Sequence, residues 1–388
     1  MSRSATPVTA TSTPPPPEEK KVEEPKIEVN GKGPAPLEKL FTKVDPAVDG
    51  EDCLRDCESC TVRYPRKFEV EEEDKLYGHI AGWATHVLVA TGKTDWVHTI
   101  EEEKGSIMEA FGKAWADGVW PTNGVSLYGG GGLLNRARKT AFPGRLANDV
   151  AQKLMLSATN IPTPTHHNDY NEPTSIILLP SFTIVENVTP AKVPELITNI
   201  IELGPTNTQL LEPGSIPRSL PDVFPTISEM TARPSPHRAL ILLCSHRTRD
   251  ARCGQSAPLL RKELERHLRP LGLFRDLDDE REGGVGIYFI NHVGGHKYSA
   301  NMMVYRRPNA FGLDEVKRAE VGDDVHPNAA PIETDLEKEG AGQCIWLARI
   351  RPEDCENIVK YTVLQGKVVK PERQLRGGFD RQKGVFSW

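Results

Sequence analysis

The feature that constrains this chain most is a set of two cysteines and two histidines, each pair placed directly after a short apolar run. The first run leads to Cys244, and Cys253 follows after eight intervening residues. The second run leads to His292, and His296 follows after three intervening residues. Short apolar runs are typical of buried strands, and open α/β sheets place their sites at the carboxyl edge of the strands. The sequence therefore predicts that these four side chains form one metal site.

The length of the chain predicts more than one domain. At 388 residues the chain is too long for one ordinary hydrophobic core, and its 32 prolines indicate long irregular segments. The beginning is rich in proline and charge, and it is poor in large apolar residues, so we expect it to be disordered. We predict a disordered tail, an N-terminal domain, a Pro-rich linker and a C-terminal domain with its own tail, at 1–45, 46–204, 205–236 and 237–388.

Apolar periodicity predicts the same order of elements in each half, namely a strand, a helix, further strands and a final helix. In the N-terminal half these are a strand at 86–90, a helix from 106 to 117, two strands within 174–188 and a helix at 190–203. In the C-terminal half they are strands at 238–243, 285–291, 302–305 and 343–350, and helices at 256–268 and 352–364. This order suits a mixed sheet flanked by helices. We predict an α/β protein of two thioredoxin-like domains.

Composition argues against several classes of protein. The net charge of -6 offers no basic field for a phosphate backbone, so nucleic acid is not the expected partner. No apolar run approaches the length of about 20 residues that a membrane-spanning helix needs. Seven cysteines without a signal peptide favour a reducing compartment, and the acid-rich start fits a mitochondrial presequence poorly. We predict a cytoplasmic protein, with the mitochondrial matrix and the nucleus as alternatives.

The surroundings of the four ligands favour a cluster over a single ion. Ser256 is the expected N-cap of the helix at 256–268, so the helix start should stabilise the Cys253 thiolate. Gly294 and Gly295 favour a tight loop with room for inorganic sulfide. Nearby residues expected to donate to sulfur, offset charge or let the backbone approach are His246, Arg247, Arg249, Arg252 and Gly254.

Two other kinds of metal site also use cysteine and histidine ligands. A Rieske site should supply a histidine two residues after its second cysteine, whereas Cys253 is followed by Gly254, Gln255 and Ser256. The sequence therefore does not fit a Rieske centre. A structural Cys2His2 zinc site uses the same types of ligand, and it remains the alternative.

Residues 238–305 resemble the sucrase/ferredoxin-like family of thioredoxin-like ferredoxins. The resemblance lies in the spacing of Cys244 and Cys253 and in the segment His-Val-Gly-Gly-His-Lys-Tyr that begins at His292, with Asn301 beyond it. It implies a non-Rieske [2Fe-2S] cluster ligated by Cys244, Cys253, His292 and His296. In related thioredoxin-like ferredoxins the last two ligands are cysteines three residues apart, and histidines replace them here.

The ligand types predict the redox chemistry of such a cluster. Four thiolates leave an oxidised [2Fe-2S] cluster formally dianionic, whereas two thiolates and two neutral imidazoles leave it neutral, so its potential should be higher. The second ring nitrogen of each imidazole can gain a proton on reduction. We predict an electron-transfer protein of cellular redox homeostasis, more than a stand-alone enzyme, that works with an unidentified redox partner.

The remaining cysteines suggest a further alternative. Cys53, Cys57 and Cys60 have spacings compatible with a metal or redox role, although no fourth ligand is evident nearby. They make a thiol oxidoreductase the third functional hypothesis for this protein, after an iron-sulfur protein and a zinc protein. Cys344 lies inside an apolar run, so we expect it to be part of the core.

The chain ends on an aromatic residue, Trp388. On composition alone a terminal tryptophan is expected to pack against the fold. Beside a cluster site, however, this ending resembles the terminal tryptophan tripeptide by which the cytosolic iron-sulfur assembly machinery recognises its clients. The resemblance implies that Trp388 binds that machinery. The sequence leaves homodimerisation open.

Overall fold

The computed structural model describes residues 34–117, 127–128, 154–211, 229–314 and 340–388. In these parts of the chain the strands form one 13-stranded mixed sheet, so the predicted α/β class is confirmed. The strands of the N-terminal half are β1 (Thr85–Ala90), β2 (Leu127–Tyr128), β3 (Leu154–Thr159), β4 (Thr174–Leu179), β5 (Thr183–Val188) and β6 (Thr231–Pro234). Those of the C-terminal half are β7 (Ala239–Cys244), β8 (Phe274–Arg275), β9 (Val285–Ile290), β10 (Met302–Arg306), β11 (Gln343–Leu347), β12 (Leu375–Asp380) and β13 (Val385–Phe386).

The helices are short except for one. Described α-helices are α1 (Leu37–Leu40), α2 (Pro46–Asp49), α3 (Ile107–Ala116), α4 (Val193–Leu196), α5 (Ala251–Leu268), α7 (Cys355–Asn357) and α8 (Pro371–Gln374). Both α4 and α7 continue into π-helical segments, at Ile197–Ile201 and Ile358–Val363. Within the described ranges, no helix is both long enough and apolar enough to cross a bilayer.

The two halves of the sheet repeat one strand order. It is β3-β1-β4-β5 in the N-terminal half and β9-β7-β10-β11 in the C-terminal half. In both, the first pair of strands is parallel and the next two pairs are antiparallel. The halves join edge to edge where Thr159 of β3 pairs with Ile290 of β9. Because one sheet runs through both halves, the division into two thioredoxin-like domains stays a prediction.

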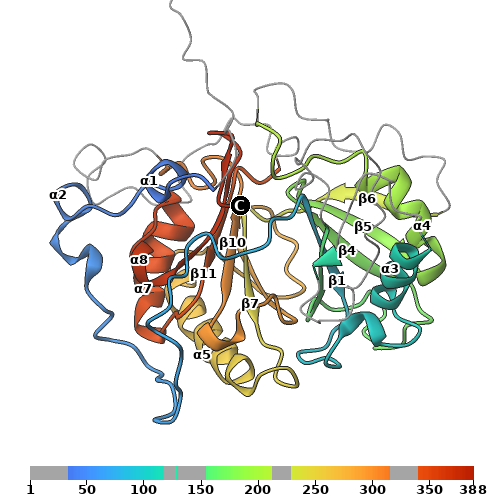
Figure 1. The fold of residues 1–388 in the computed structure, drawn as a ribbon, viewed down its shortest axis with the longest axis horizontal. Coiled ribbons are helices and arrows are strands. Elements are labelled where there is room, and N and C mark those ends of the chain that lie inside the picture. The colour runs from blue at the N-terminus through green and yellow to red at the C-terminus, as the bar shows by residue number, and fades with distance from the viewer. Residues whose placement is uncertain (1–33, 118–126, 129–153, 212–228, 315–339) are drawn as a thin grey trace, which may run out of the picture.

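Side chains that alternate along the central strands explain how the halves pack. Val87 and Val89 of β1 belong to the core beneath the helices, whereas Leu88 joins a second core that also contains Leu242 of β7. Figure 1 shows α3 and α4 beside the N-terminal strands and α5, α7 and α8 beside the C-terminal strands. The faces without helices therefore bury their apolar residues against each other.

A polar contact lies inside this shared core. His86 of β1 is fully buried, and its ring forms hydrogen bonds to Ser157 of the same half, at 2.8 Å, and to Tyr305 of the other half, at 3.0 Å. Burial lowers the pKa of His86 to about 3, so the ring is neutral. The contact links the halves without burying a charge.

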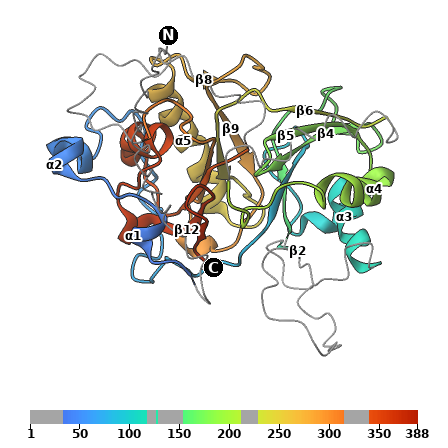
Figure 2. The same ribbon diagram turned by 90° about the horizontal axis from the view of Figure 1, so that it is seen from above.

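The ordered N-terminal segment packs against the C-terminal half. We expected disorder as far as residue 45, but Leu40 and Phe41 are buried and Lys43 forms a β-bridge with Val368. The expectation was wrong for residues 34–45, because these apolar side chains gain a distant partner surface that local composition does not reveal. Figures 1 and 2 show α1 and α2 on the side of α7 and α8, far from them in sequence.

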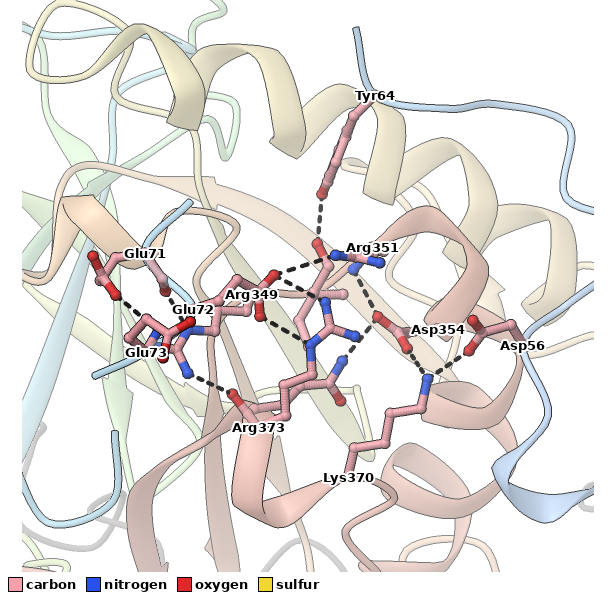
Figure 3. Close-up of polar contacts among 12 residues, drawn as sticks. Asp56, Tyr64, Glu71, Glu72, Glu73, Arg349, Arg351, Asp354, Lys370 and Arg373 are labelled. Atoms are coloured by element: carbon pink, nitrogen blue, oxygen red, sulfur yellow. Dashed lines mark hydrogen bonds and ion pairs between the residues drawn. The ribbon is translucent and has the colours of Figure 1, made fainter. Parts of the chain in front are cut away.

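Polar contacts tie the next part of this segment to the same half, as Figure 3 shows. The Tyr64 hydroxyl donates to the Ile350 carbonyl at 2.7 Å. Lys370 lies between Asp56, at 2.5 Å, and Asp354, at 2.6 Å. Residues 56–64 are thereby held beside Ile350, Asp354 and Lys370 of the C-terminal half.

Two predicted boundaries differ in the structure. Helix α5 begins at Ala251 rather than Ser256, because the Asp250 side chain accepts from the Arg252 amide at 2.9 Å and so caps the helix earlier. Strand β6 lies in the segment predicted as an irregular linker. It pairs with β5 at one end of the sheet, where an edge strand tolerates Pro234. The position of a linker between domains stays a prediction.

Candidate metal centre

Three of the four predicted ligands converge in the C-terminal half. Cys244 ends β7, Cys253 lies in the first turn of α5, and His292 follows β9 by two residues. Their donor atoms all lie within 4.8 Å of one another, and the Cys244 Sγ to His292 Nδ1 distance is 3.9 Å. Each of these residues is at most 5% exposed. The parallel pairing of β7 with β9 brings the two turns together at one edge, as predicted.

Hydrogen bonding shifts the pKa values of the two cysteines in opposite directions. A hydrogen bond from Cys253 lowers the pKa of Cys244 well below its usual value, and His292 adds to the effect against the opposing cost of burial. The same bond, followed by burial, raises the pKa of Cys253. The geometry therefore favours a thiolate at Cys244 with a thiol donor beside it. A metal binds thiolates, so occupation would release the remaining proton from Cys253.

The fourth predicted ligand lies beside this group rather than within it. The rings of His292 and His296 have centroids 5.5 Å apart, and His296 is exposed. Between them Gly294 and Gly295 adopt φ values of +83° and +65°, which glycine tolerates best. The chain therefore turns sharply and presents the two imidazoles side by side, one buried and one exposed.

His246 positions the buried histidine instead of contacting sulfur. Its Nδ1 accepts a hydrogen bond from the His292 amide at 3.2 Å, and its Nε2 donates to the Trp96 carbonyl at 3.0 Å. These two bonds fix the tautomer of the His246 ring. Burial lowers its pKa, which favours the neutral form that this pattern requires.

A loop of the N-terminal half holds the turn that follows Cys244. The Ser245 hydroxyl donates to the Thr94 carbonyl at 2.9 Å. Asp95 accepts from the Thr248 amide at 3.0 Å and from its hydroxyl at 2.7 Å. Residues 94–96 therefore brace the ligand turn from the other half of the molecule.

The basic residues near Cys244 have partners other than sulfur. Arg249 donates to the ring of His98 at 2.8 Å, and Arg252 forms an ion pair with Asp250 at 2.8 Å. At Gly254 a Cβ atom would lie 2.5 Å from the Cβ of Arg247, while the predicted approach of this backbone to the metal group stays a prediction. The glycine lets α5 pack against the turn, which supports the site indirectly.

Arg376 on β12 clamps the histidine loop, and no sequence signal predicted this. Its guanidinium donates to the Gly294 carbonyl at 3.1 Å and to the Asn301 side chain at 2.6 Å. It also stacks over Trp346, 4.4 Å from the ring centroid. Because Arg376 lies 82 residues from Gly294 in sequence, no local pattern joins them.

Comparison with known proteins identifies the family. The family model described as sucrase/ferredoxin-like matches residues 76–377, which is most of the chain. The protein belongs to the sucrase/ferredoxin-like family. The match includes both ligand turns and the bracing loop of the N-terminal half.

Three curated relatives of this family member show different extents of similarity. Actin patches distal protein 1 of Saccharomyces cerevisiae is 28% identical over 273 residues, which cover 69% of this chain and 77% of the relative. Altered inheritance of mitochondria protein 32 of Clavispora lusitaniae is 29% identical over 134 residues, which cover 34% of this chain and 33% of the relative. The protein of that name from Debaryomyces hansenii is 30% identical over 131 residues, with 34% and 33% covered. No solved structure matches the chain.

The other cysteines of this sucrase/ferredoxin-like protein lie away from the centre. Cys344 is completely buried in β11, which confirms that it belongs to the core. Cys53 packs in a small cluster with Tyr361. The Cys60 thiol donates to the Val62 carbonyl at 3.0 Å, while Cys57 faces His267. A thiol oxidoreductase function stays a prediction.

Trp388 packs against the fold of this family member. Its ring lies 4.7 Å from that of Trp83 and stacks on Phe386 at 5.3 Å. Gly82 leaves the space for it, because a Cβ atom there would lie 2.0 Å from the indole. Recognition of Trp388 by another protein would therefore require its ring to leave this position.

Proposed function

We propose that the protein carries electrons on a [2Fe-2S] cluster bound by Cys244, Cys253, His292 and His296. The observation that carries the proposal is the convergence of two buried thiols and a buried imidazole, with a second imidazole beside them. These are the coarse features of a metal site, and the family membership is consistent with them. The identity of the metal group is the proposed step.

The donor set fits a two-iron cluster better than a single ion. A tetrahedral zinc ion with bonds of about 2.0–2.3 Å needs all four donors within about 4 Å of one another. Cys244, Cys253 and His292 meet a similar condition, whereas His296 is not part of the convergent group. A cluster with two irons spreads its ligands further apart. The left-handed glycines between the histidines let the loop turn sharply, and the missing side chain of Gly295 leaves room for the Arg376 guanidinium that holds the loop.

The residues of the chain would hold and tune this group. A bound cluster supplies one-electron chemistry. Cys244 and Cys253 provide thiolates, while His246 and Arg376 hold the backbone on either side of His292. Two neutral imidazole ligands carry no charge, and each keeps an N–H on its second ring nitrogen. At a pH where an oxidised cluster had caused a ring to release that proton, reduction would return the proton to the same nitrogen. The exposed His296 gives that proton a direct path from solvent.

Protein purified without oxygen tests the proposal. We expect a coloured sample with iron and acid-labile sulfide in equal amounts, and a paramagnetic resonance signal after reduction by dithionite. His292→Ala should lose or destabilise the cluster, and His292→Cys should lower its potential if assembly succeeds. Colourless protein that contains stoichiometric zinc would refute the cluster and support a structural zinc site instead.

We also propose that the protein obtains its cluster in the cytosol, through contact between Trp388 and the iron-sulfur assembly machinery. The support is the likeness of the ending to the tripeptide that this machinery reads. Deletion of Trp388 should lower the iron content of protein isolated from cells while chemical reconstitution in vitro still succeeds. If reconstitution is lost as well, the packing of Trp388 on Trp83 explains the defect instead.

A further inference from the structure

A second group of metal-binding side chains lies at the far end of α5 from the first centre. It combines Cys57 of the N-terminal segment, His267 of the last turn of α5 and Glu356 of α7, with donor atoms all within 4.8 Å of one another. The Cys57 Sγ to His267 Nε2 distance is 3.9 Å. Cys57 is 7% exposed, and the His267 side chain is 14% exposed. These residues come from three segments that meet only in the folded chain.

A fourth donor lies one helical turn before the histidine. Glu263 is four residues before His267 on α5, which places both side chains on one face of the helix. Its Oε2 lies 3.9 Å from the His267 Nε2, and its side chain is completely buried. Thr61 donates to the other oxygen, Oε1, through its amide and its hydroxyl. The Glu263 carboxylate is therefore oriented with its Oε2 toward His267, one of the other three donors.

A cation already occupies the point where three of these donors converge. The Arg266 guanidinium donates to the Glu263 Oε2 at 2.8 Å, to the His267 Nε2 at 2.9 Å and to the Cys57 Sγ at 3.3 Å. Since His267 accepts through Nε2, that nitrogen presents a lone pair, as a metal ligand must. The Arg266 side chain is 30% exposed, so it can move outward into solvent.

We propose that Cys57, Glu263, His267 and Glu356 form a zinc site in which Zn²⁺ replaces the Arg266 guanidinium. Tetrahedral zinc with bonds of about 2.0–2.3 Å places its donors roughly 3.5 Å apart. The two separations of 3.9 Å therefore need to close by about 0.4 Å, and a separation at the 4.8 Å limit of the Cys57, His267 and Glu356 group by about 1.3 Å. Binding exchanges the Cys57 S–H bond for an S–Zn bond, and the thiol proton goes to solvent. The doubly charged ion then faces one thiolate and two carboxylates, while the displaced Arg266 charge is solvated.

The choice of Zn²⁺ follows from the types of donor. One thiolate, one imidazole and carboxylates make a set of intermediate softness, which suits zinc better than magnesium or calcium. Neighbouring contacts hold the Cys57 segment in place. The Cys57 amide donates to the Glu353 carbonyl at 3.0 Å, and Asp56 pairs with Lys370, which Figure 3 shows beside Asp354.

Protection of Cys57 from alkylation tests the site in the full chain. Reaction with N-ethylmaleimide, with and without Zn²⁺, is followed by mass spectrometry of the peptide that contains Cys57. We expect Zn²⁺ to slow the modification of Cys57, and His267→Ala to abolish this protection. His167→Ala, an exposed histidine of the other half, serves as the control and should leave it intact. Protection that persists in His267→Ala would overturn the proposal.

Removal of the competing arginine gives the sharpest test. Arg266→Ala should raise the affinity for Zn²⁺ by about tenfold or more, because the metal no longer displaces charge-assisted hydrogen bonds. His267→Ala should lower the affinity by more than about 100-fold, since even outer-sphere partners contribute 10- to 100-fold. Arg269→Ala, at the C-cap of the same helix, is the matched control. An affinity that is unchanged in Arg266→Ala contradicts the proposed displacement.

A measurement in a second background separates this site from the first centre. In the full chain with Cys244→Ser and Cys253→Ser, Co²⁺ should still give a thiolate-to-cobalt charge-transfer band, and the further change Cys57→Ser should remove it. Circular dichroism checks that each variant is folded. A band that does not depend on Cys57 would refute the second site, whereas the iron and sulfide content of the unaltered chain decides the first centre independently.

Discussion

The two halves of the sheet have the same strand order, yet within the described ranges only one of them gathers candidate metal ligands at the end of its central strands. Ala90 pairs with Thr159 at the end of β1, and Cys244 pairs with Ile290 at the equivalent end of β7. His292 lies two residues after the end of β9. At the equivalent position, two residues after the end of β3, the N-terminal half has Ile161. The same strand framework can therefore be built with or without a candidate metal centre, depending on the side chains at these few positions.

The seam between the halves is nearly symmetric. Asn160 follows β3 and accepts from the Phe289 amide at 2.7 Å, while Asn291 follows β9 and accepts from the Ala158 amide at 3.0 Å. Each asparagine thus extends the single backbone pairing between the halves. The N-terminal half therefore supports the candidate centre through this seam and through the loop that contains Asp95.

The largest expected effect comes from the residue that most clearly distinguishes the halves. Cys244→Ala gives the C-terminal half the residue found at Ala90, and we expect complete loss of bound iron and sulfide. The control is Cys344→Ala, which removes an equally buried thiol from the core. That variant should lose about 1–2 kcal/mol of stability but keep its cluster. Metal analysis of both purified proteins provides the check, and a Cys244→Ala protein that retains iron and sulfide would break the comparison.

A pair of glycines tests the shape of the ligand loop. Gly295→Ala places a Cβ atom 2.6 Å from Arg376 at a φ of +65°, whereas Gly105→Ala in the N-terminal half meets nothing within 4 Å at a φ of +78°. We expect a loss of about 2–3 kcal/mol for the first and about 1 kcal/mol for the second, because only the first adds a clash to the backbone strain. Urea unfolding of both variants measures the difference. Equal losses of stability in the two variants would show that the Arg376 side chain moves away without cost.

The supporting role of the N-terminal half is tested at Asp95. Asp95→Ala leaves the Thr248 amide and hydroxyl without their acceptor, so we expect a loss of about 1–3 kcal/mol and faster release of the cluster. Asp169→Ala removes an exposed carboxylate that only caps its own turn, and it should change neither quantity appreciably. Bleaching of the cluster in the presence of a chelator gives the rate. Equal rates in the two variants would remove the bracing role.

Acid should weaken the contact between the halves. The pKa of His86 is about 3 in the folded protein because of burial, and that of an unfolded histidine is about 6.5, so between these values the unfolded state binds the extra proton. Stability from this residue is therefore complete above pH 6.5 and decreases by up to about 1.4 kcal/mol per pH unit as the pH falls toward 3. His237, with a pKa lowered to about 4 mainly by burial, acts in the same direction. Unfolding at several pH values should show a smaller slope for His86→Gln, and an unchanged slope would argue against this assignment.

The smallest expected effect concerns His292 and His296, the proposed histidine ligands of the C-terminal half. If reduction takes up one proton, the potential should fall by up to about 59 mV per pH unit as the pH rises. Voltammetry between mildly acidic and alkaline pH measures the slope. A flat profile would leave electron transfer uncoupled from the proton and make His292 and His296 simple ligands.

Much of the fold followed from local patterns. The strand at Thr85–Ala90 and the helix that Ser106 caps lie where periodicity predicted them, because side-chain alternation and capping depend on neighbours a few residues away. The start of α5 was missed because Asp250 and Ser256 are both good N-caps, and only the folded chain buries Ser256 inside the helix. Burial of Leu40 was missed since its partner surface is distant in sequence.

The candidate centre shows the same division. Cys244, Cys253 and His292 were predicted from strand ends, and the structure brings them together. Trp96, which fixes His246, lies 150 residues away from it, so no spacing rule could have paired them. The same holds for His267, because its partner Cys57 lies 210 residues away in the sequence.

The sequence by itself determined the α/β class, the positions of most strands and helices, and the residues that offer themselves as ligands, because each depends on residue type and short-range spacing. Only the tertiary structure decided which half braces the other, which arginine clamps the histidine loop and which histidine faces Cys57. These contacts depend on the path of the whole chain through one continuous sheet. That path is set by the burial of apolar faces from both halves, which no local stretch of sequence specifies.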